Sequence, residues 1–161
     1  MICAFTGHRP EKLPWGMDES DPRCGALKQK LLQTVLEQAA EGADVFLCGM
    51  ARGCDLYFAQ AVLDAKQARP ELRLEAWLPC PSQAERWTQR EKSCYRRLLE
   101  QCDRVLVLEP AYSDGCMLRR NRAMVERCDR LISVWDGSGG GTAATIRYAR
   151  KSGRTLIGLW L

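Results

Sequence analysis

A glycine-rich turn at residues 134–145 is the part of the chain best suited to binding a ligand. Its sequence, VWDGSGGGTAAT, places four glycines in five positions between an apolar run and a helical pattern. Glycine has no Cβ, so the backbone can adopt positive φ values and a ligand can approach the main chain closely. The four glycines are Gly137, Gly139, Gly140 and Gly141.

Thr142 follows these glycines and is expected to cap the next helix. The first amide groups of a helix have no partners within the helix and lie at the positive end of its dipole. A phosphate would satisfy those amides. The pattern therefore favours a phosphate site over a flexible surface turn, which is the alternative for a cluster of Gly and Ser.

Two other glycine-bearing turns follow predicted strands. The turn TGHRP contributes Thr6, Gly7, His8 and Arg9, and the turn GMARGCD contributes Gly49, Arg52, Gly53 and Asp55. Because the carboxyl ends of parallel strands lie at one edge of a sheet, we expect both turns to converge with Asp136–Thr142 on one ligand. The alternative is that the glycines of the second turn serve only packing and that Asp55 is a plain helix cap.

The densest basic cluster is Arg119, Arg120, Asn121 and Arg122. Four consecutive helical positions cannot all face one way, so at least one of the arginines should be solvated. We expect Asn121 and Arg122 to approach the ligand, because the apolar pair Met124–Val125 follows them. Charge patterning alone leaves a solvated face open for these two residues.

His8 is the only histidine, which excludes a histidine-rich metal site. A lone loop histidine is more often structural than catalytic, because a general base needs a placed partner. The sequence therefore assigns no catalytic residue and no metal site.

Composition indicates one domain over residues 1–161, with 46% hydrophobic residues available for a core. The net charge of +4 suggests anionic ligands but falls short of a nucleic-acid-binding tail. The nine cysteines are spread without metal-ligand spacing and should be reduced, mostly buried thiols of an intracellular protein. The N-terminal apolar stretch is too short for a signal peptide and no apolar run reaches about 18 residues, so we expect a soluble, cytoplasmic protein.

Strand and helix patterns alternate along the whole chain. Apolar runs predict strands at 2–5, 45–48, 72–78, 105–108, 131–135 and 156–159. The helices between them are predicted to begin at Asp21–Pro22, after Asp55, at a Ser82–Glu85 capping box running to about Gln101, at Met117 and at Ala143.

This alternation predicts an α/β fold with a doubly wound parallel sheet of about six strands and helices on both faces. The expected strand order is 3-2-1-4-5-6, with the ligand crevice near strands 1 and 4. The third strand is somewhat polar and is expected at a sheet edge.

Five motifs resemble the YpsA-like family of the SLOG superfamily, which also includes the LOG phosphoribohydrolases and the DNA-processing protein DprA. They are TGHRP at 6–10, CGMARGCD at 48–55, PCPSQAERW at 79–87, RNRAMV at 120–125 and DGSGGGT at 136–142. The resemblance implies a Rossmann-like fold and a nucleotide or ADP-ribose-like ligand, but no particular reaction.

Two departures from these relatives bear on function. LOG hydrolases carry a glutamate three residues after the threonine of their glycine motif, and this chain has Thr145 there. DprA has a turn resembling GMARGCD but is longer and basic enough to hold single-stranded DNA, whereas this chain shows no evident track of stacking aromatics.

The leading hypothesis is a nucleotide-binding or nucleotide-sensing protein, with no certain cofactor. One alternative is a phosphoribohydrolase or N-glycosidase acting on nucleoside monophosphates, with Asp55, Glu109 or Asp136 replacing the missing carboxylate. Another is nucleic-acid binding through Arg119–Arg122. No membrane partner is expected, and a homo-oligomer is compatible with the sequence.

Overall fold

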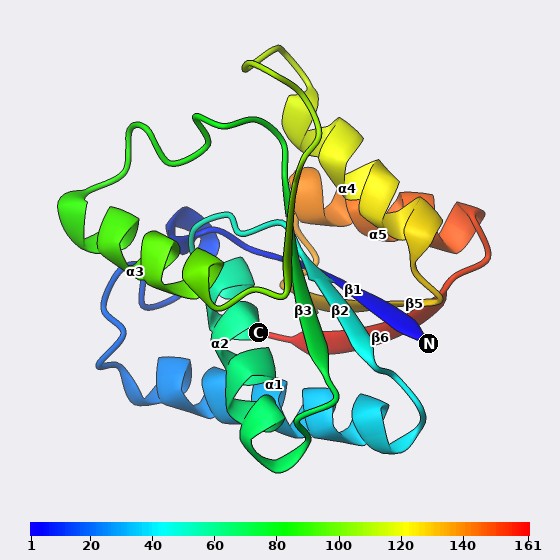
Figure 1. Ribbon diagram of the computed structural model, residues 1–161. Helices are drawn as coiled ribbons and strands as arrows, with labels where there is room; N and C mark the ends of the chain where they lie inside the picture. The colour runs from blue at the N-terminus through cyan, green and yellow to red at the C-terminus, as the bar shows by residue number, and fades with distance from the viewer.

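The computed structural model describes residues 1–161 as one six-stranded parallel sheet with five α-helices and a short 3-10 turn (Figure 1). The strands are β1 Ile2–Gly7, β2 Val45–Cys48, β3 Arg73–Leu78, β4 Arg104–Val107, β5 Arg130–Trp135 and β6 Thr155–Trp160. The helices are η1 Pro10–Lys12, α1 Pro22–Ala40, α2 Cys54–Ala68, α3 Gln89–Glu100, α4 Cys116–Arg127 and α5 Gly141–Lys151. The predicted α/β, doubly wound Rossmann-like class is confirmed.

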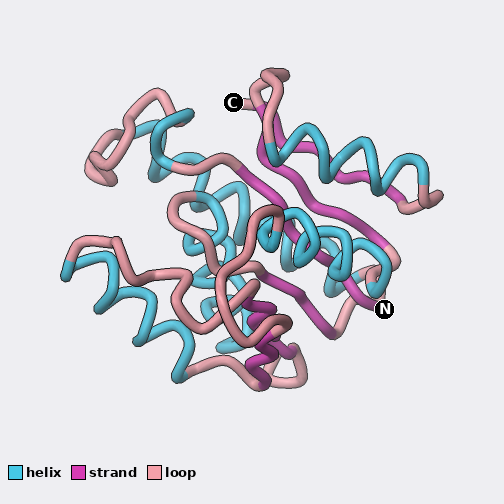
Figure 2. The backbone as a smooth tube through the Cα atoms, turned by 90° about the horizontal axis from the view of Figure 1, so that it is seen from above, coloured by secondary structure: helices cyan, strands magenta, loops and turns pink.

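Helices cover both faces of the sheet because parallel strands need crossover connections that bury both sides. On one face, α1, α2 and α3 pack on the sheet, and the rings of Phe5 and Phe58 stack with centroids 4.4 Å apart. On the other face, Met124 of α4 and Ile146 of α5 cover Leu131 of β5. In Figure 2 the strands run through the middle of the molecule with helices around them.

The strand order is β4-β3-β2-β1-β5-β6, so the predicted order 3-2-1-4-5-6 was wrong in the place of the fourth strand. β4 pairs with β3, and β1 pairs directly with β5. The chain therefore reverses its winding direction between β4 and β5, one unit later than expected. A right-handed crossover is compatible with either direction, so the alternation of elements does not reveal the point of reversal.

β3 is an internal strand, which corrects its predicted place at a sheet edge. Leu74 and Ala76 are fully buried, whereas Val105 and Val107 of β4 are 45% and 43% exposed. The polar residue that suggested an edge, Glu75, accepts a 3.0 Å hydrogen bond from Trp77 Nε1. A polar side chain in a strand can thus be satisfied locally by a neighbour on the same face.

The start of α1 is as predicted, and the start of α3 is not. Asp21 accepts a 2.8 Å hydrogen bond from the amide of Arg23, and Pro22 occupies the first turn. The capping box of α3 is formed by Thr88 and Glu91, six residues after the predicted one. The S/T-x-x-E pattern occurs twice in this segment. The first occurrence, Ser82–Glu85, lies in the loop before the helix, where Gln83 is buried.

None of the helices combines the length and apolar character needed to cross a lipid bilayer. All nine cysteines are free thiols, and seven of them are buried.

Candidate functional site

A cavity of about 380 Å³ lies at the carboxyl edge of the sheet, where β1 and β5 end. We call it the carboxyl-edge cavity. Residues from the turns after β1, β2 and β5 line it together with residues from α4, so the predicted convergence of three turns is observed. Nine predicted ligand residues are in the lining: Thr6, Gly7, His8, Arg9, Asp55, Asn121, Gly140, Gly141 and Thr142.

The glycine-rich turn ends at Gly140, which is the residue before the first turn of α5. Gly140 has φ +132°, a conformation that residues with a Cβ rarely adopt. Thr142 was predicted to cap this helix, but it lies within the first turn and is buried. The helix therefore begins on glycine backbone, which leaves room beside its first amide groups.

Asp136 holds the glycine-rich turn in shape. Its Oδ1 accepts hydrogen bonds from the amide of Ser138 at 2.9 Å and from the Ser138 hydroxyl at 2.6 Å, and lies 2.8 Å from His8 Nε2. These bonds, with Ser138 contributing most, hold the pKa of Asp136 well below its usual value. Asp136 thus orders the turn, and His8, which is buried, reaches it from the end of β1.

Lys12 is a cation at the cavity that the sequence analysis did not identify. Its ammonium donates a 3.0 Å hydrogen bond to Ser138 Oγ and another to the carbonyl of Gly139. A Cβ on Gly140 would lie 2.9 Å from Lys12 Nζ, so the ammonium sits directly over the turn. The only sequence signal is that Lys12 follows the TGHRP motif closely, in the 3-10 turn η1.

Arg120, rather than Arg122, is the buried arginine of the basic cluster. It is 2% exposed, and it donates to the carbonyl oxygens of Gly49 and, at 3.1 Å, Trp77. A Cβ on Gly49 would lie 2.5 Å from Arg120 Cζ, so a larger residue there would displace the guanidinium from its present position. The sequence signal for this burial is helical spacing, because Arg120 lies four residues before the buried Met124 and therefore on the same face of the helix.

Asp55 is a buried carboxylate in the cavity wall. It lies inside the first turn of α2, after the cap residue Gly53, and accepts a 3.0 Å hydrogen bond from the amide of Ala51. Burial raises the pKa of Asp55, and the nearby guanidinium of Arg120 opposes this rise. Asp55 therefore closes its own turn rather than capping the helix, and protonation would relieve part of its burial cost.

The remaining predicted ligand residues lie outside the lining of the carboxyl-edge cavity. Gly49 is packed against Arg120, while Arg52 and Gly53 line a second cavity among the helices. The guanidinium of Arg122 lies 5.2 Å from the ring centroid of Tyr148. The full set outside the lining is Gly49, Arg52, Gly53, Arg122, Asp136 and Gly139.

The basic cluster does not form one continuous surface. Arg119 pairs with Glu109 at 2.9 Å, Arg120 is buried, and Arg122 lies against Tyr148. Asn121 donates a 3.0 Å hydrogen bond to Thr145 Oγ1 and accepts one at 2.8 Å from Arg120 Nε. Asn121 thus joins α4 to α5 at the cavity wall.

The structure shows what surrounds Thr145 and where the carboxylates lie that were considered as replacements for the LOG glutamate. Thr145, at the place of the glutamate of LOG hydrolases, is buried and donates a 2.8 Å hydrogen bond to the carbonyl of Gly141. Glu109 is engaged by Arg119 and Ser113 away from the cavity. Of the three carboxylates considered as a replacement, only Asp55 lines the cavity.

Comparisons with known proteins agree with the fold and the motifs. The chain is 28% identical over 138 residues to a UPF0398 protein of Bacillus pumilus, covering 84% of this chain and 73% of the relative. It is 27% identical over 145 residues to the uncharacterized SPbeta prophage-derived protein YoqJ of Bacillus subtilis, covering 82% of this chain and 85% of the relative.

Two solved structures resemble this fold. DNA processing protein A from Helicobacter pylori, described with its single-stranded DNA binding mode, matches with a TM-score of 0.65 at 20% identity. The Streptococcus pneumoniae protein DprA matches with a TM-score of 0.63 at 15% identity. Both matches cover 98% of this chain but only 64% and 49% of the respective DprA chains, so the likeness concerns the fold alone.

The family predicted from the five motifs is confirmed by a family model, described as the YspA SLOG family, that matches residues 3–153. This match includes all three glycine-bearing turns and α4. The chain belongs to the YpsA family of SLOG proteins.

Proposed function

We propose that the chain binds a nucleotide or nucleotide derivative in the carboxyl-edge cavity, with a phosphate at Gly140, Gly141 and Thr142. The observation that carries this proposal is the start of α5, which opens on the cavity beside Lys12 and Arg9. Unpartnered helix amides and nearby cations together favour a bound anion. A cavity of about 380 Å³ also lies within the range of small-molecule sites.

Lys12 is proposed to contact the phosphate. Its ammonium already lies over the glycine-rich turn through Ser138 and Gly139. A phosphate at the first turn of α5 would be adjacent to that ammonium and would form a charge-assisted hydrogen bond with it.

Two considerations favour a small nucleotide over a nucleic-acid strand. SLOG membership suggests a nucleotide-like ligand. Single-stranded DNA binding is described for the DprA of Helicobacter pylori, but here the three arginines of the basic cluster point to different partners and offer no shared track for a strand.

Thermal unfolding with a ligand panel tests the proposal. ATP, NAD, ADP-ribose and nucleoside monophosphates are compared at millimolar concentration. A ligand at 100 times its Kd stabilises the folded state by about 2.7 kcal/mol, a rise in Tm of roughly 5 to 10 °C for a chain of this size. Lys12→Ala should reduce that rise, while Arg96→Ala, an exposed change on α3, should not. No shift with any ligand would contradict the proposal.

A second candidate, N-glycosidic hydrolysis of nucleoside monophosphates, rests on Asp55. It is a buried carboxylate with a raised pKa in the cavity wall, properties that suit a general acid or base. Incubation with AMP should then release free base, and Asp55→Asn should stop the release without abolishing AMP binding. Bound AMP that stays intact would reject this candidate and leave the binding proposal standing.

A further inference from the structure

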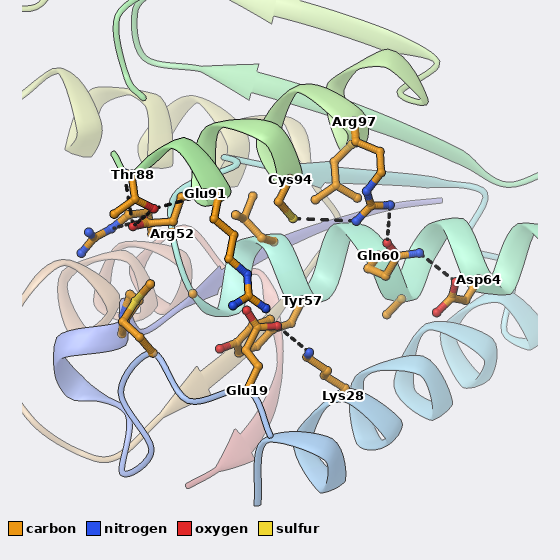
Figure 3. Close-up of a pocket in the computed structure, with 17 residues that line it drawn as sticks. Glu19, Lys28, Arg52, Tyr57, Gln60, Asp64, Thr88, Glu91, Cys94 and Arg97 are labelled. Atoms are coloured by element: carbon orange, nitrogen blue, oxygen red, sulfur yellow. Dashed lines mark hydrogen bonds and ion pairs between the residues drawn. The ribbon is translucent and has the colours of Figure 1, made fainter. Parts of the chain in front are cut away.

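A second cavity of about 480 Å³ lies among α1, α2 and α3 (Figure 3). We call it the interhelical cavity. The 3-10 turn η1 lies between it and the carboxyl-edge cavity, because Pro10 lines the former while Glu11 and Lys12 line the latter. The two cavities are therefore separate sites with a shared wall.

Part of the lining of the interhelical cavity is apolar. The apolar side chains that are accessible in the lining are Met17, Leu56 of α2 and Cys94 of α3. Leu98 of α3 also belongs to the lining but is 1% exposed, so it supports the cavity from beneath. Apolar surface in a concave site of this volume is suited to the apolar body of a small ligand.

The three acidic residues of the lining already have partners. Glu19 pairs with Lys28 at 2.6 Å, and Asp64 accepts a 2.9 Å hydrogen bond from Gln60. Glu91 lies 3.4 Å from Arg52 Nε and also belongs to the capping box of α3. Figure 3 shows these pairs among the residues that line the cavity.

Two arginines of the lining, by contrast, have no carboxylate partner. Arg97 donates only to Gln60 Oε1, at 3.1 Å, and to Cys94 Sγ, at 3.8 Å, and Arg90 is paired with no acid. They are seven residues apart on α3, which places them on one face of the helix. The cavity thus combines an apolar part of its lining with two exposed guanidinium groups that have no carboxylate partner.

We propose that the interhelical cavity binds a small amphiphilic anion, with its apolar body on Met17, Leu56 and Cys94 and its carboxylate or phosphate at Arg90 and Arg97. Guanidinium groups match the oxygen geometry of both kinds of head group. The proposal does not depend on nucleotide binding in the carboxyl-edge cavity.

Displacement of a fluorescent anion tests both halves of the proposal. The probe is 1-anilinonaphthalene-8-sulfonate, and the competitors are decanoate, decyl phosphate and decanol below their aggregation limits. Decanoate and decyl phosphate should displace the probe, with the tighter of the two identifying the preferred head group. Decanol should be about tenfold weaker or worse, because it lacks the charge. Equal displacement by decanol would overturn the proposal.

Variants on one helix supply the matched control. Arg90→Gln together with Arg97→Gln should weaken decanoate binding roughly tenfold to a hundredfold, the loss expected for charge-assisted hydrogen bonds. Arg96→Gln, on the same helix but outside the cavity lining, should leave it unchanged. An equal effect of Arg96→Gln would mean that only general charge is involved and would overturn the proposal.

Alkylation of Cys94 locates the ligand. This thiol is half-buried and lines the cavity, so its reaction with N-ethylmaleimide can be followed by mass spectrometry. Decanoate should slow the modification of Cys94, while AMP should not. Unchanged modification under saturating decanoate would place the binding elsewhere, and protection by AMP would show that the two cavities are not separate sites.

Discussion

The Nε2 of His8 lies 2.8 Å from Oδ1 of Asp136, which joins the end of β1 to the glycine-rich turn after β5. The same oxygen accepts both hydrogen bonds from Ser138. One carboxylate therefore organises the turn that the proposed phosphate would contact.

Asp136→Asn should lower the free energy of unfolding in a pH-dependent way. The folded-state pKa of Asp136 is depressed below the unfolded value of about 3.9, so its stabilising effect is complete above roughly pH 5 and is lost as pH falls through the folded-state pKa. Urea unfolding at pH 3 and pH 7 measures this. The gap between wild type and Asp136→Asn should be smaller at pH 3, and Asp114→Asn, an exposed loop change, serves as control. An equal difference in unfolding free energy at both pH values would contradict the role of the Asp136 carboxylate as the charged acceptor that orders the turn.

Gly140→Val should abolish nucleotide binding in a protein that still unfolds cooperatively. The residue has φ +132°, and an added Cβ would lie 2.9 Å from Lys12 Nζ. Gly139→Ala is the control, because a Cβ there meets nothing within 4 Å and φ is not positive. Affinity and Tm are measured for both variants. Wild-type affinity in a folded Gly140→Val protein would show that the phosphate site is misplaced.

Lys12→Ala and Arg122→Ala should differ in their effect on nucleotide affinity. Lys12 lies over the glycine-rich turn, and losing a charge-assisted hydrogen bond should weaken binding about tenfold or more. Arg122 lies against Tyr148 and outside the lining, so its loss should change affinity less than about twofold. The sequence predicted that Arg122 approaches the ligand, because the apolar pair Met124–Val125 follows it. Titration calorimetry on both variants decides whether Lys12 or Arg122 contacts the phosphate.

Arg120→Met should destabilise the fold by about 3 kcal/mol, because it removes the guanidinium that stabilises the charge of the buried Asp55 and that donates to the carbonyl oxygens of Gly49 and Trp77. Adding Asp55→Asn should recover part of that loss, since the buried charge is then gone. Arg119→Met removes an exposed pair with Glu109 and should cost less than about 1 kcal/mol. Similar losses for both arginine variants in urea unfolding would refute the buried role of Arg120.

Thr88→Ala should lower the free energy of unfolding by about 1 kcal/mol, the usual value of a helix cap. Ser82→Ala should have almost no effect, because Ser82 lies in the loop before α3. Chemical unfolding of the two variants compares the observed capping box with the one that the sequence suggested. A larger loss for Ser82→Ala would mean that α3 starts earlier than the structure shows.

Local signals in the sequence determined the type of each element and the place of the glycine-rich turns. Asp21–Pro22 marked the start of α1, and the apolar run before Asp136 marked β5, because capping and periodicity depend on neighbouring residues only. The convergence of three turns also followed from sequence, since parallel strands must end at one edge.

Tertiary structure decided what depends on residues far apart in the chain. β4 joined β3 rather than β1, because a crossover helix is compatible with either direction of winding. The rotation of α4 buried Arg120 and left Arg122 at the surface, and this rotation is set by packing on the sheet rather than by charge. Lys12 reached the glycine-rich turn only because η1 folds across the end of β5, a contact between residues 126 positions apart.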